Sequence, residues 1–398
     1  MNSSLPQADG IIARWVVLRS DIHQCVRVAT ANTFHLPRRT VAAIAGIGFS
    51  FLLVFMQLGF LNTARIVVTR LYGYCDFDLA IVAREYQFLY ETIPFHRVRL
   101  SQARALPEVE ATFALNVRGA DWLNTRIDRE SSLMLIGLDR DPRFIANPDI
   151  EAALPMIRKG QRAILDTLSH GDYGDLAIGG NGLINGFLTK VVGHFQLGMF
   201  FFTDGAAIVD NGEFIRLSGV DSRQVTIGLI RLTEGARPRK VAEALDRLLP
   251  EDVLIYTRAS LIAQEQDYFI SVRPIGILFR MGAFISYLVG LVILYQILAT
   301  EMANHIREFA TLRAMGFRSR FIYGIGIIQA MLFISMAFLP ALATAYGVFE
   351  SISTLTPFPI TMTPTLILSV LGLSLGTCFI SAPLALSRLR RADPAELF

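Results

Sequence analysis

The chain has 398 residues, of which 53% are hydrophobic and 18% are charged. Soluble globular proteins carry about 25% charged residues, so this composition excludes an ordinary soluble domain and indicates a membrane protein. The net charge of +3 does not favour nucleic acid as a partner. The three cysteines, Cys25, Cys75 and Cys378, are too widely separated for a disulfide framework or a metal-ligand spacing.

Residues 1–40 form the first predicted region, a cytoplasmic N-terminal segment with an amphipathic helix pattern. Its apolar residues recur at intervals of three and four, and they are Ile11, Trp15, Leu18, Ile22, Val26 and Ala29. Such a helix could lie in the inner membrane interface with Trp15 at headgroup level. It could equally be an ordinary helix packed on something cytoplasmic, and the sequence does not separate these interpretations.

Four apolar segments follow, each reaching the length of about 20 residues that a helix needs to cross a bilayer. We therefore predict transmembrane helices at residues 41–61, 275–299, 321–349 and 364–386. Within these segments the one charged residue is Arg280, in the second. This arginine either reaches outward to the membrane interface or lines a subunit interface or substrate path.

Residues 62–271, between the first and second apolar segments, mix strand and helix patterns. We predict strands at 76–83, 132–138, 194–202, 206–209 and 225–232, and helices at 97–106, 149–159 and 238–249. Residues 118–188 are rich in Gly and Asp, and we expect them to form a more variable lobe. The predicted fold class is an α-helical membrane protein with four transmembrane helices, one plus three, and a large α+β extracytoplasmic domain between the first and second.

Arginine positions predict the orientation in the membrane. The loop 300–320 carries four arginines and the tail 387–398 carries three, whereas the loop 350–363 has no Lys or Arg. Short loops rich in arginine stay in the cytoplasm. Both termini and the 300–320 loop are therefore expected inside, and residues 62–271 outside in the periplasm. On this topology Cys75 should react with an impermeant thiol reagent, and Cys25 should not.

The sequence contains no recognisable catalytic motif. No G-x-x-x-x-G-K-[ST] phosphate loop occurs, and the glycine-rich run Gly179–Gly186 lacks its lysine, so we interpret that run as a turn. The run His170–Asp175 holds an imidazole and two carboxylates that could ligate a cation, but a solvated loop is the commoner structure. We therefore predict no catalytic, cofactor-binding or metal-binding residues, and a protein that is not an enzyme.

The loop 300–320 is the part of the chain that could carry a mechanism. It is helix-permissive up to Gly316, a residue that often ends helices. Its apolar side chains are Ile306, Phe309 and Leu312, and Glu308 and Arg313 carry opposite charges. A short helix of this kind could dock in a groove of a cytoplasmic partner. It could also be a re-entry turn whose arginines hold the topology, and composition alone leaves both interpretations open.

The sequence EFATLRAMGF, from Glu308 to Phe317, closely resembles the coupling-helix signature of the MacB/FtsX-type (type VII) ABC permeases. Within that superfamily the chain looks like the DevC family, the permeases of DevBCA-type exporters. Other matching stretches are Phe55–Phe60, Val289–Leu298, Pro357–Thr363, Arg390–Phe398 and, in the outer domain, Thr226–Ala236. The likeness covers Arg38 to the C-terminus and is thin over Glu85–Leu188.

This resemblance implies a homodimeric permease subunit in the inner membrane that exports a glycolipid or similar amphiphile. It implies three partners: a separate DevA-like ABC ATPase that binds the ATP, a DevB-like periplasmic adaptor, and through it a TolC-like outer-membrane channel. The residues that would contact the ATPase are Glu308, Phe309, Ala310, Thr311, Leu312, Arg313, Ala314, Met315 and Gly316. The alternative is a non-transporting receptor or regulator that signals between its periplasmic domain and a cytoplasmic partner.

Overall fold

The computed structural model describes residues 25–31, 33, 37–125, 128–169, 177–198, 203–308, 311, 315, 319–356 and 358–389. The chain divides into two compact units. The helical unit comprises Met1–Phe60, Leu278–Ser351 and Thr361–Phe398. The α+β unit comprises Leu61–Ile277 and Ile352–Ile360.

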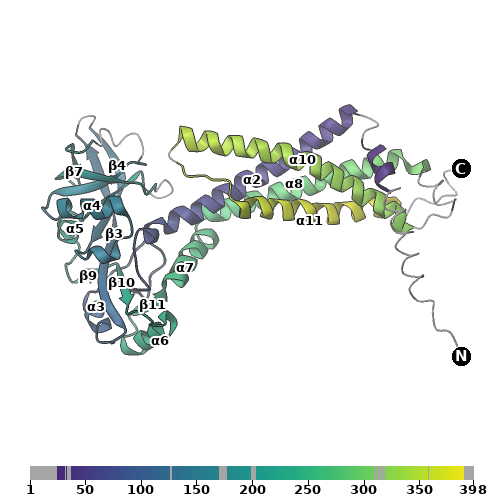
Figure 1. Ribbon diagram of the computed structural model, residues 1–398. Helices are drawn as coiled ribbons and strands as arrows, with labels where there is room; N and C mark the ends of the chain where they lie inside the picture. Colours follow the sequence, from purple (N-terminus) through teal and green to yellow (C-terminus); the bar gives the residue numbers. More distant parts are fainter. Residues whose placement is uncertain are drawn as a thin grey trace, which may run out of the picture. The chain divides into compact units, whose positions relative to one another are not determined.

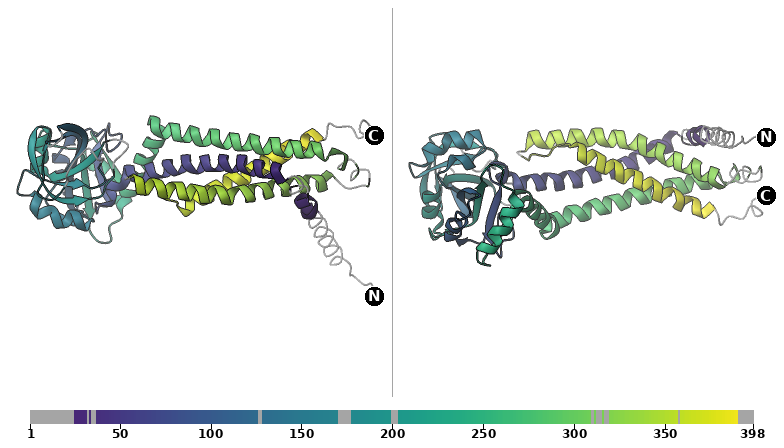
Figure 2. Two further views of the ribbon diagram at one scale, coloured as in Figure 1. Left: turned by 90° about the horizontal axis from the view of Figure 1, so that it is seen from above. Right: turned by 60° about the horizontal axis from the view of Figure 1, so that its bottom comes forward.

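Within the described part of the chain, four helices are long and apolar enough to cross a membrane. They are α2 (Pro37–Gly73), α8 (Pro274–Asn304), α10 (Ser319–Leu355) and α11 (Pro364–Leu389). Figures 1 and 2 show them side by side in the helical unit. The four predicted apolar helices are confirmed, and α2 runs 12 residues beyond the end of its apolar segment at Leu61. Arg280 lies on α8 and is exposed.

Small residues let these helices approach one another closely. A Cβ atom on Gly48 of α2 would lie 3.4 Å from the carbonyl oxygen of Ala337 in α10. A Cβ atom on Gly290 of α8 would lie 3.2 Å from the Cβ atom of Ser50 in α2. Lipid tails are as apolar as these side chains, so close van der Waals packing holds membrane helices together where hydrophobic burial cannot.

Strands and short helices alternate along the α+β unit (Figure 1). The strands are β1 (Leu79–Ala83), β2 (Phe95–His96), β3 (Val109–Asn124), β4 (Arg129–Leu138), β5 (Arg162–Asp166), β6 (Asn181–Ile184), β7 (Phe187–Phe195), β8 (Gly205–Asp210), β9 (Gln224–Val225), β10 (Ile227–Leu232) and β11 (Val253–Thr257). The helices are α3 (Val98–Ala103), η1 (Pro142–Phe144), α4 (Pro148–Ile157), α5 (Asn211–Ser218), α6 (Pro238–Leu248) and α7 (Arg258–Ser271). This order confirms a large α+β region.

The described strands pair into a nine-stranded sheet in the order β11-β1-β10-β3-β4-β8-β5-β7-β6, beside a two-stranded sheet of β2 and β9. β3 also pairs with β6, so the strands from β3 round to β6 close into a ring. β4 and β8 run parallel, as do β5 and β7, while the other pairs are antiparallel. Trp122 is buried in the ring against Gly182, where a Cβ atom would lie 2.3 Å from the indole.

A two-residue turn sets the register of β6 and β7. Asn185 and Gly186 have φ angles of 48° and 80°, and Ile184 pairs with Phe187 across the turn. Asn-Gly tolerates such positive angles, which match the twist of a hairpin. The strand predicted at 194–202 is therefore misplaced: the hairpin starts the strand at Phe187 and the strand ends at Phe195, while residues 199–202 lie outside the described residues. The run Gly179–Gly186, predicted as a turn, contains strand β6 as well.

Sequence reasoning placed the other predicted strands and helices within a few residues of the observed ones. It missed β3, the longest strand, as well as β5, β11, α5 and α7. The run 170–176, with the possible cation ligands His170 and Asp175, lies outside the described residues.

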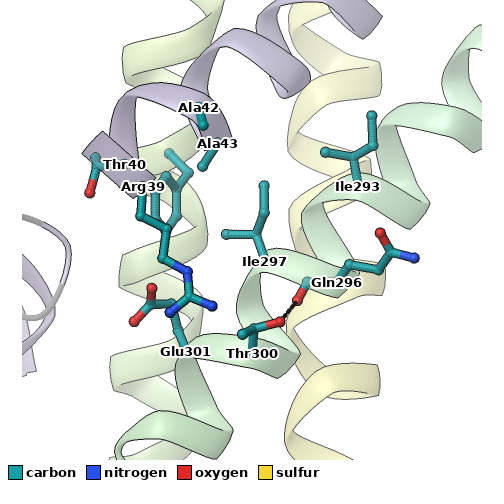
Figure 3. A pocket seen from close by; sticks show the side chains of 10 residues that line it. Arg39, Thr40, Ala42, Ala43, Ile293, Gln296, Ile297, Thr300 and Glu301 are labelled. Carbon is teal, nitrogen blue, oxygen red and sulfur yellow. Dashed lines mark hydrogen bonds between the residues drawn. The ribbon is translucent and has the colours of Figure 1, made fainter. Parts of the chain in front are cut away.

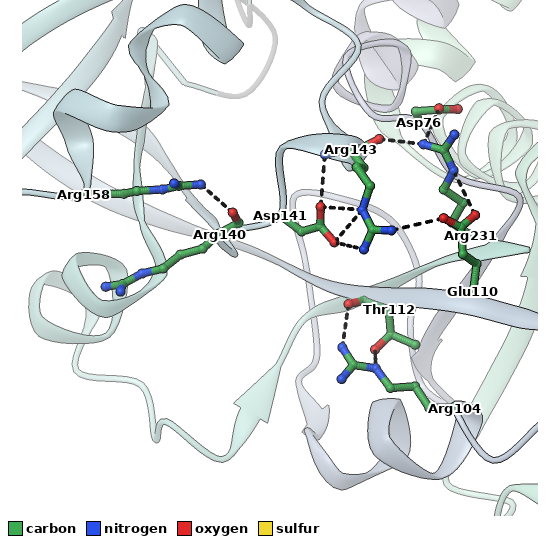
Figure 4. Close-up of polar contacts among 9 residues, drawn as sticks. All are labelled: Asp76, Arg104, Glu110, Thr112, Arg140, Asp141, Arg143, Arg158 and Arg231. Carbon is green, nitrogen blue, oxygen red and sulfur yellow. Dashed lines mark hydrogen bonds and ion pairs between the residues drawn. The ribbon is translucent and has the colours of Figure 1, made fainter.

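An arginine–carboxylate network holds η1 against neighbouring strands (Figure 4). Arg143 pairs with Asp141 at 2.7 Å and with Glu110 of β3 at 3.1 Å. Arg231 of β10 reaches Glu110 at 3.5 Å and Asp76 at 3.1 Å. Hydrogen bonds from Arg143 lower the pKa of the Asp141 carboxyl. Because these side chains are exposed or partly exposed, solvent screens the pairs and we expect them to contribute little to folding.

A buried carboxylate joins three segments of the α+β unit. Glu265 of α7 is fully buried, and its Oε1 accepts hydrogen bonds from the hydroxyls of Tyr72, at the end of α2, and Tyr86, in the loop after β1. Its Oε2 accepts a hydrogen bond from the backbone N–H of Leu89 at 3.0 Å. Burial raises the pKa of Glu265 to about 7, although these hydrogen bonds oppose the shift.

The three cysteines are buried, which corrects the predicted labelling of Cys75. Its side chain is 1% exposed, and burial raises the pKa of the thiol to about 12. A thiol reagent is attacked by an exposed thiolate, so the buried, protonated Cys75 should be inert on either side of a membrane. The sequence could not show this, because Cys75 lies between the polar and aromatic residues Tyr74 and Asp76, a pattern typical of a surface turn.

Candidate functional site

The predicted ATPase-contacting residues begin just after α8 ends at Asn304. The structure describes Glu308, Thr311 and Met315, whereas Phe309, Ala310, Leu312, Arg313, Ala314 and Gly316 lie outside the described residues. The Thr311 hydroxyl donates to the Arg307 carbonyl at 2.9 Å, and the Met315 N–H donates to the Thr311 carbonyl at 2.9 Å. The second is a backbone bond to the fourth preceding residue, which is the α-helical spacing. Thr311 itself is helical.

Glu308 and Met315 are both accessible to a partner. Glu308 is exposed, and Met315 has 63% of its surface exposed. Methionine is one of the residue types enriched in protein interfaces. With Thr311, which is also exposed, they make up the described part of the predicted docking surface.

His305 links α8 to the start of this segment. Its Nε2 lies 3.7 Å from Glu301 Oε2, and its Nδ1 lies 3.0 Å from Glu308 Oε1. The second contact has the distance of an ion pair but not the alignment of a hydrogen bond. A protonated imidazole has two N–H donors, so it could bridge both carboxylates. Sequence reasoning missed this group, although the i, i+4 and i, i+3 spacing of Glu301, His305 and Glu308 on a helix predicts it.

A short N-terminal helix packs against the two helices that flank the segment. Residues 25–31 are helical, and Cys25 and Ala29 are buried with Met302 of α8 and Ile325 of α10. The Cys25 thiol donates to the Phe321 carbonyl at 3.6 Å. This part of the predicted amphipathic helix is therefore packed on the protein itself. Ile11 and Trp15, on which the membrane-interface interpretation depends, lie outside the described residues.

Among the described residues, no group of three or more His, Cys, Asp or Glu side chains could hold a metal ion. The described residues of the site are the carboxylates of Glu301 and Glu308 with His305 between them, and the exposed Met315. The helix at residues 25–31 packs beside them on α8 and α10.

Comparisons with known proteins place this segment inside a recognised domain. Residues 280–394 match the family model described as the FtsX-like permease C-terminal, which covers α10, α11 and the segment before them. This match spans less than half of the chain. A search of curated proteins finds no match.

Solved structures with low similarity to the chain include a periplasmic region and an extracellular domain. The periplasmic region of MacB from Actinobacillus actinomycetemcomitans is 10% identical, with a TM-score of 0.34 over 49% of this chain and 95% of that one. The extracellular domain of the noncanonic ABC-type transporter YknZ from Gram-positive bacteria is 11% identical, with a TM-score of 0.31 over 45% and 98%. A domain of a permease-like protein from Porphyromonas gingivalis is 13% identical, with a TM-score of 0.28 over 47% and 88%.

Proposed function

We propose that the chain is the permease subunit of an ABC export system, driven by a separate cytoplasmic ATPase. The observation that carries the proposal is the match of residues 280–394 to the FtsX-like permease C-terminal family. Four helices long enough to cross a membrane and the exposed residues Glu308 and Met315 between α8 and α10 agree with this role. In the proposal, residues 308–316 bind the ATPase.

The finer proposal follows the resemblance to the DevC family. Two copies of the chain form the permease, and the α+β unit faces the periplasm and engages an adaptor that leads to an outer-membrane channel. The cargo is a glycolipid or another amphiphile. ATP binds to the ATPase partner, and its hydrolysis moves α2 and α8 through the segment 305–316.

The proposal is tested by affinity purification from the native host. A tag on the full chain should co-purify an ABC ATPase in about equal amounts, together with an adaptor protein. Recovery of a histidine kinase or a cell-wall hydrolase in place of an ATPase and an adaptor would favour a receptor or regulator and contradict export.

The proposed orientation has its own test, which the buried native cysteines make possible. Ile178 of the α+β unit has 67% of its surface exposed, and Met315 has 63%. We expect Ile178→Cys to react with an impermeant maleimide in intact spheroplasts and Met315→Cys to react only after permeabilisation. The wild-type chain serves as the control and should stay unlabelled, because its three thiols are buried. The reverse labelling would overturn the orientation.

A further inference from the structure

A cavity lies between the start of α2 and the end of α8 (Figure 3). Its volume is about 300 Å³, and Phe333 of α10 also lines it. This volume lies at the lower end of the range in which proteins bind small ligands. The whole cavity belongs to the helical unit.

Opposite charges face each other at one end of the cavity. Figure 3 shows the Arg39 guanidinium of α2 beside the Glu301 carboxylate of α8. They form no ion pair within 4.0 Å, and Arg39 has no ion-pair partner among the described residues. Glu301 is largely buried, and among the described residues its ion-pair contact is the one with His305. Fixed charges on two walls of one cavity, left unpaired with each other, suit a ligand that carries both signs.

The rest of the cavity is apolar. Ile297 and Ile293 precede Glu301 by four and eight residues, so the three side chains form a row along one face of α8, about 12 Å long. Ala43 of α2 faces this row, and its small side chain leaves the space open. The cavity is therefore charged at Glu301 and apolar at Ile293, which lies deeper in the apolar span of α8.

We propose that this cavity binds a zwitterionic glycerophospholipid with a primary ammonium headgroup. The phosphate lies against Arg39, whose guanidinium can donate two parallel hydrogen bonds to it. The ammonium lies against Glu301, and the first acyl carbons follow Ile297 and Ile293. The lipid thus bridges Arg39 of α2 and Glu301 of α8, which form no ion pair with each other. This proposal requires the helical unit to lie in a bilayer and does not depend on the cargo or the ATPase.

The test uses the purified full-length chain in nanodiscs that contain phosphatidylethanolamine and phosphatidylglycerol in equal amounts. After transfer to detergent, native mass spectrometry measures the lipid that stays bound. The wild-type chain should retain phosphatidylethanolamine about tenfold more than phosphatidylglycerol. Equal retention of the two lipids would overturn the proposal without any variant.

Variants then locate the site. Arg39→Gln and Glu301→Gln should each reduce retained phosphatidylethanolamine about tenfold, the effect of one charge-assisted contact. Arg38→Gln is the matched control, because Arg38 is an exposed neighbouring arginine that does not line the cavity. An equal loss in Arg38→Gln, or no loss in Glu301→Gln, would contradict the site.

Two further arms separate the lipid from other occupants. Soluble glycerophosphoethanolamine has the same headgroup without acyl chains, and it should not displace the lipid at millimolar concentration. Displacement would mean that a soluble zwitterion is the ligand. Ile297→Cys should not form disulfide-linked dimers under mild oxidation. Such dimers would mean that a second copy of the chain fills the cavity.

Discussion

Replacing Glu265 by alanine is expected to lower the free energy of unfolding of the α+β unit by about 3–5 kcal/mol. The change leaves a cavity and removes the acceptor of three hydrogen bonds, from Tyr72, Tyr86 and the backbone N–H of Leu89. The chain has two tryptophans, and Trp122 is buried in this unit. Urea unfolding of the full chain in a Trp15→Phe background, followed by Trp122 fluorescence, measures the loss.

Glu265→Gln is the matched control for this variant. An amide has the same size, and its oxygen can accept from Leu89 while its N–H groups donate to the tyrosine oxygens. We expect Glu265→Gln to stay within about 1 kcal/mol of the wild-type stability at pH 5. A loss in Glu265→Gln as large as in Glu265→Ala would show that the hydrogen-bond arrangement at Glu265 is not as described.

The same residue predicts a pH dependence. Burial raises the pKa of Glu265 from 4.5 to about 7, so the folded state binds the proton more tightly than the unfolded state does. The resulting stabilisation is complete below pH 4.5 and is lost as the pH rises through 7. A shift of this size corresponds to about 3 kcal/mol. The wild-type chain should lose this stability between pH 4.5 and pH 8 by the Trp122 assay, whereas Glu265→Gln should lose much less.

Glu308→Lys is expected to uncouple ATP hydrolysis from export. Glu308 is exposed at the start of the proposed ATPase-binding segment, and lysine reverses its charge. Like charges across an interface cost several kcal/mol, so export should fall at least about tenfold. The assay complements a deletion strain and measures the lipid that fails to reach the outer membrane. ATP hydrolysis by the purified ATPase, which does not depend on this segment, should continue.

The exposed Glu350, which lies towards the other end of α10, provides the control for charge reversal. Glu350→Lys should leave export unchanged. Glu308→Gln separates loss of the acid from introduction of a base, and we expect an intermediate effect. Unaltered export in Glu308→Lys would count against the role of the segment.

The membrane helices were predictable from sequence because their signal is local. About 20 consecutive apolar residues can be found without knowing any contact. The ends of α2 and α8 were harder to predict, because both helices continue into mixed sequence such as Arg65 and Glu301, where apolar content no longer marks them. The inner segment was predicted from the motif at Glu308, and the neighbouring His305 was missed although its spacing from Glu301 and Glu308 was available.

The α+β unit was predicted less well, because its structure depends on residues far apart in the chain. Tyr72, Tyr86 and Glu265 form one cluster across nearly 200 positions, and no local pattern joins them. The burial of Cys75 has the same cause. The Asn185-Gly186 hairpin is different: the dipeptide is a strong local signal, and using it would have placed β6 and β7 correctly.

Site-specific photo-crosslinking tests most directly whether the inner segment contacts an ATPase. A photo-reactive amino acid replaces Met315, which is 63% exposed, or Leu355 at the far end of α10, which is 83% exposed. The chain is then co-expressed with the ABC ATPase with which it co-purifies, and the cells are illuminated. We predict a crosslinked product of the chain and the ATPase from position 315 and none from position 355. No product from position 315, or equal products from both positions, would contradict the proposed function.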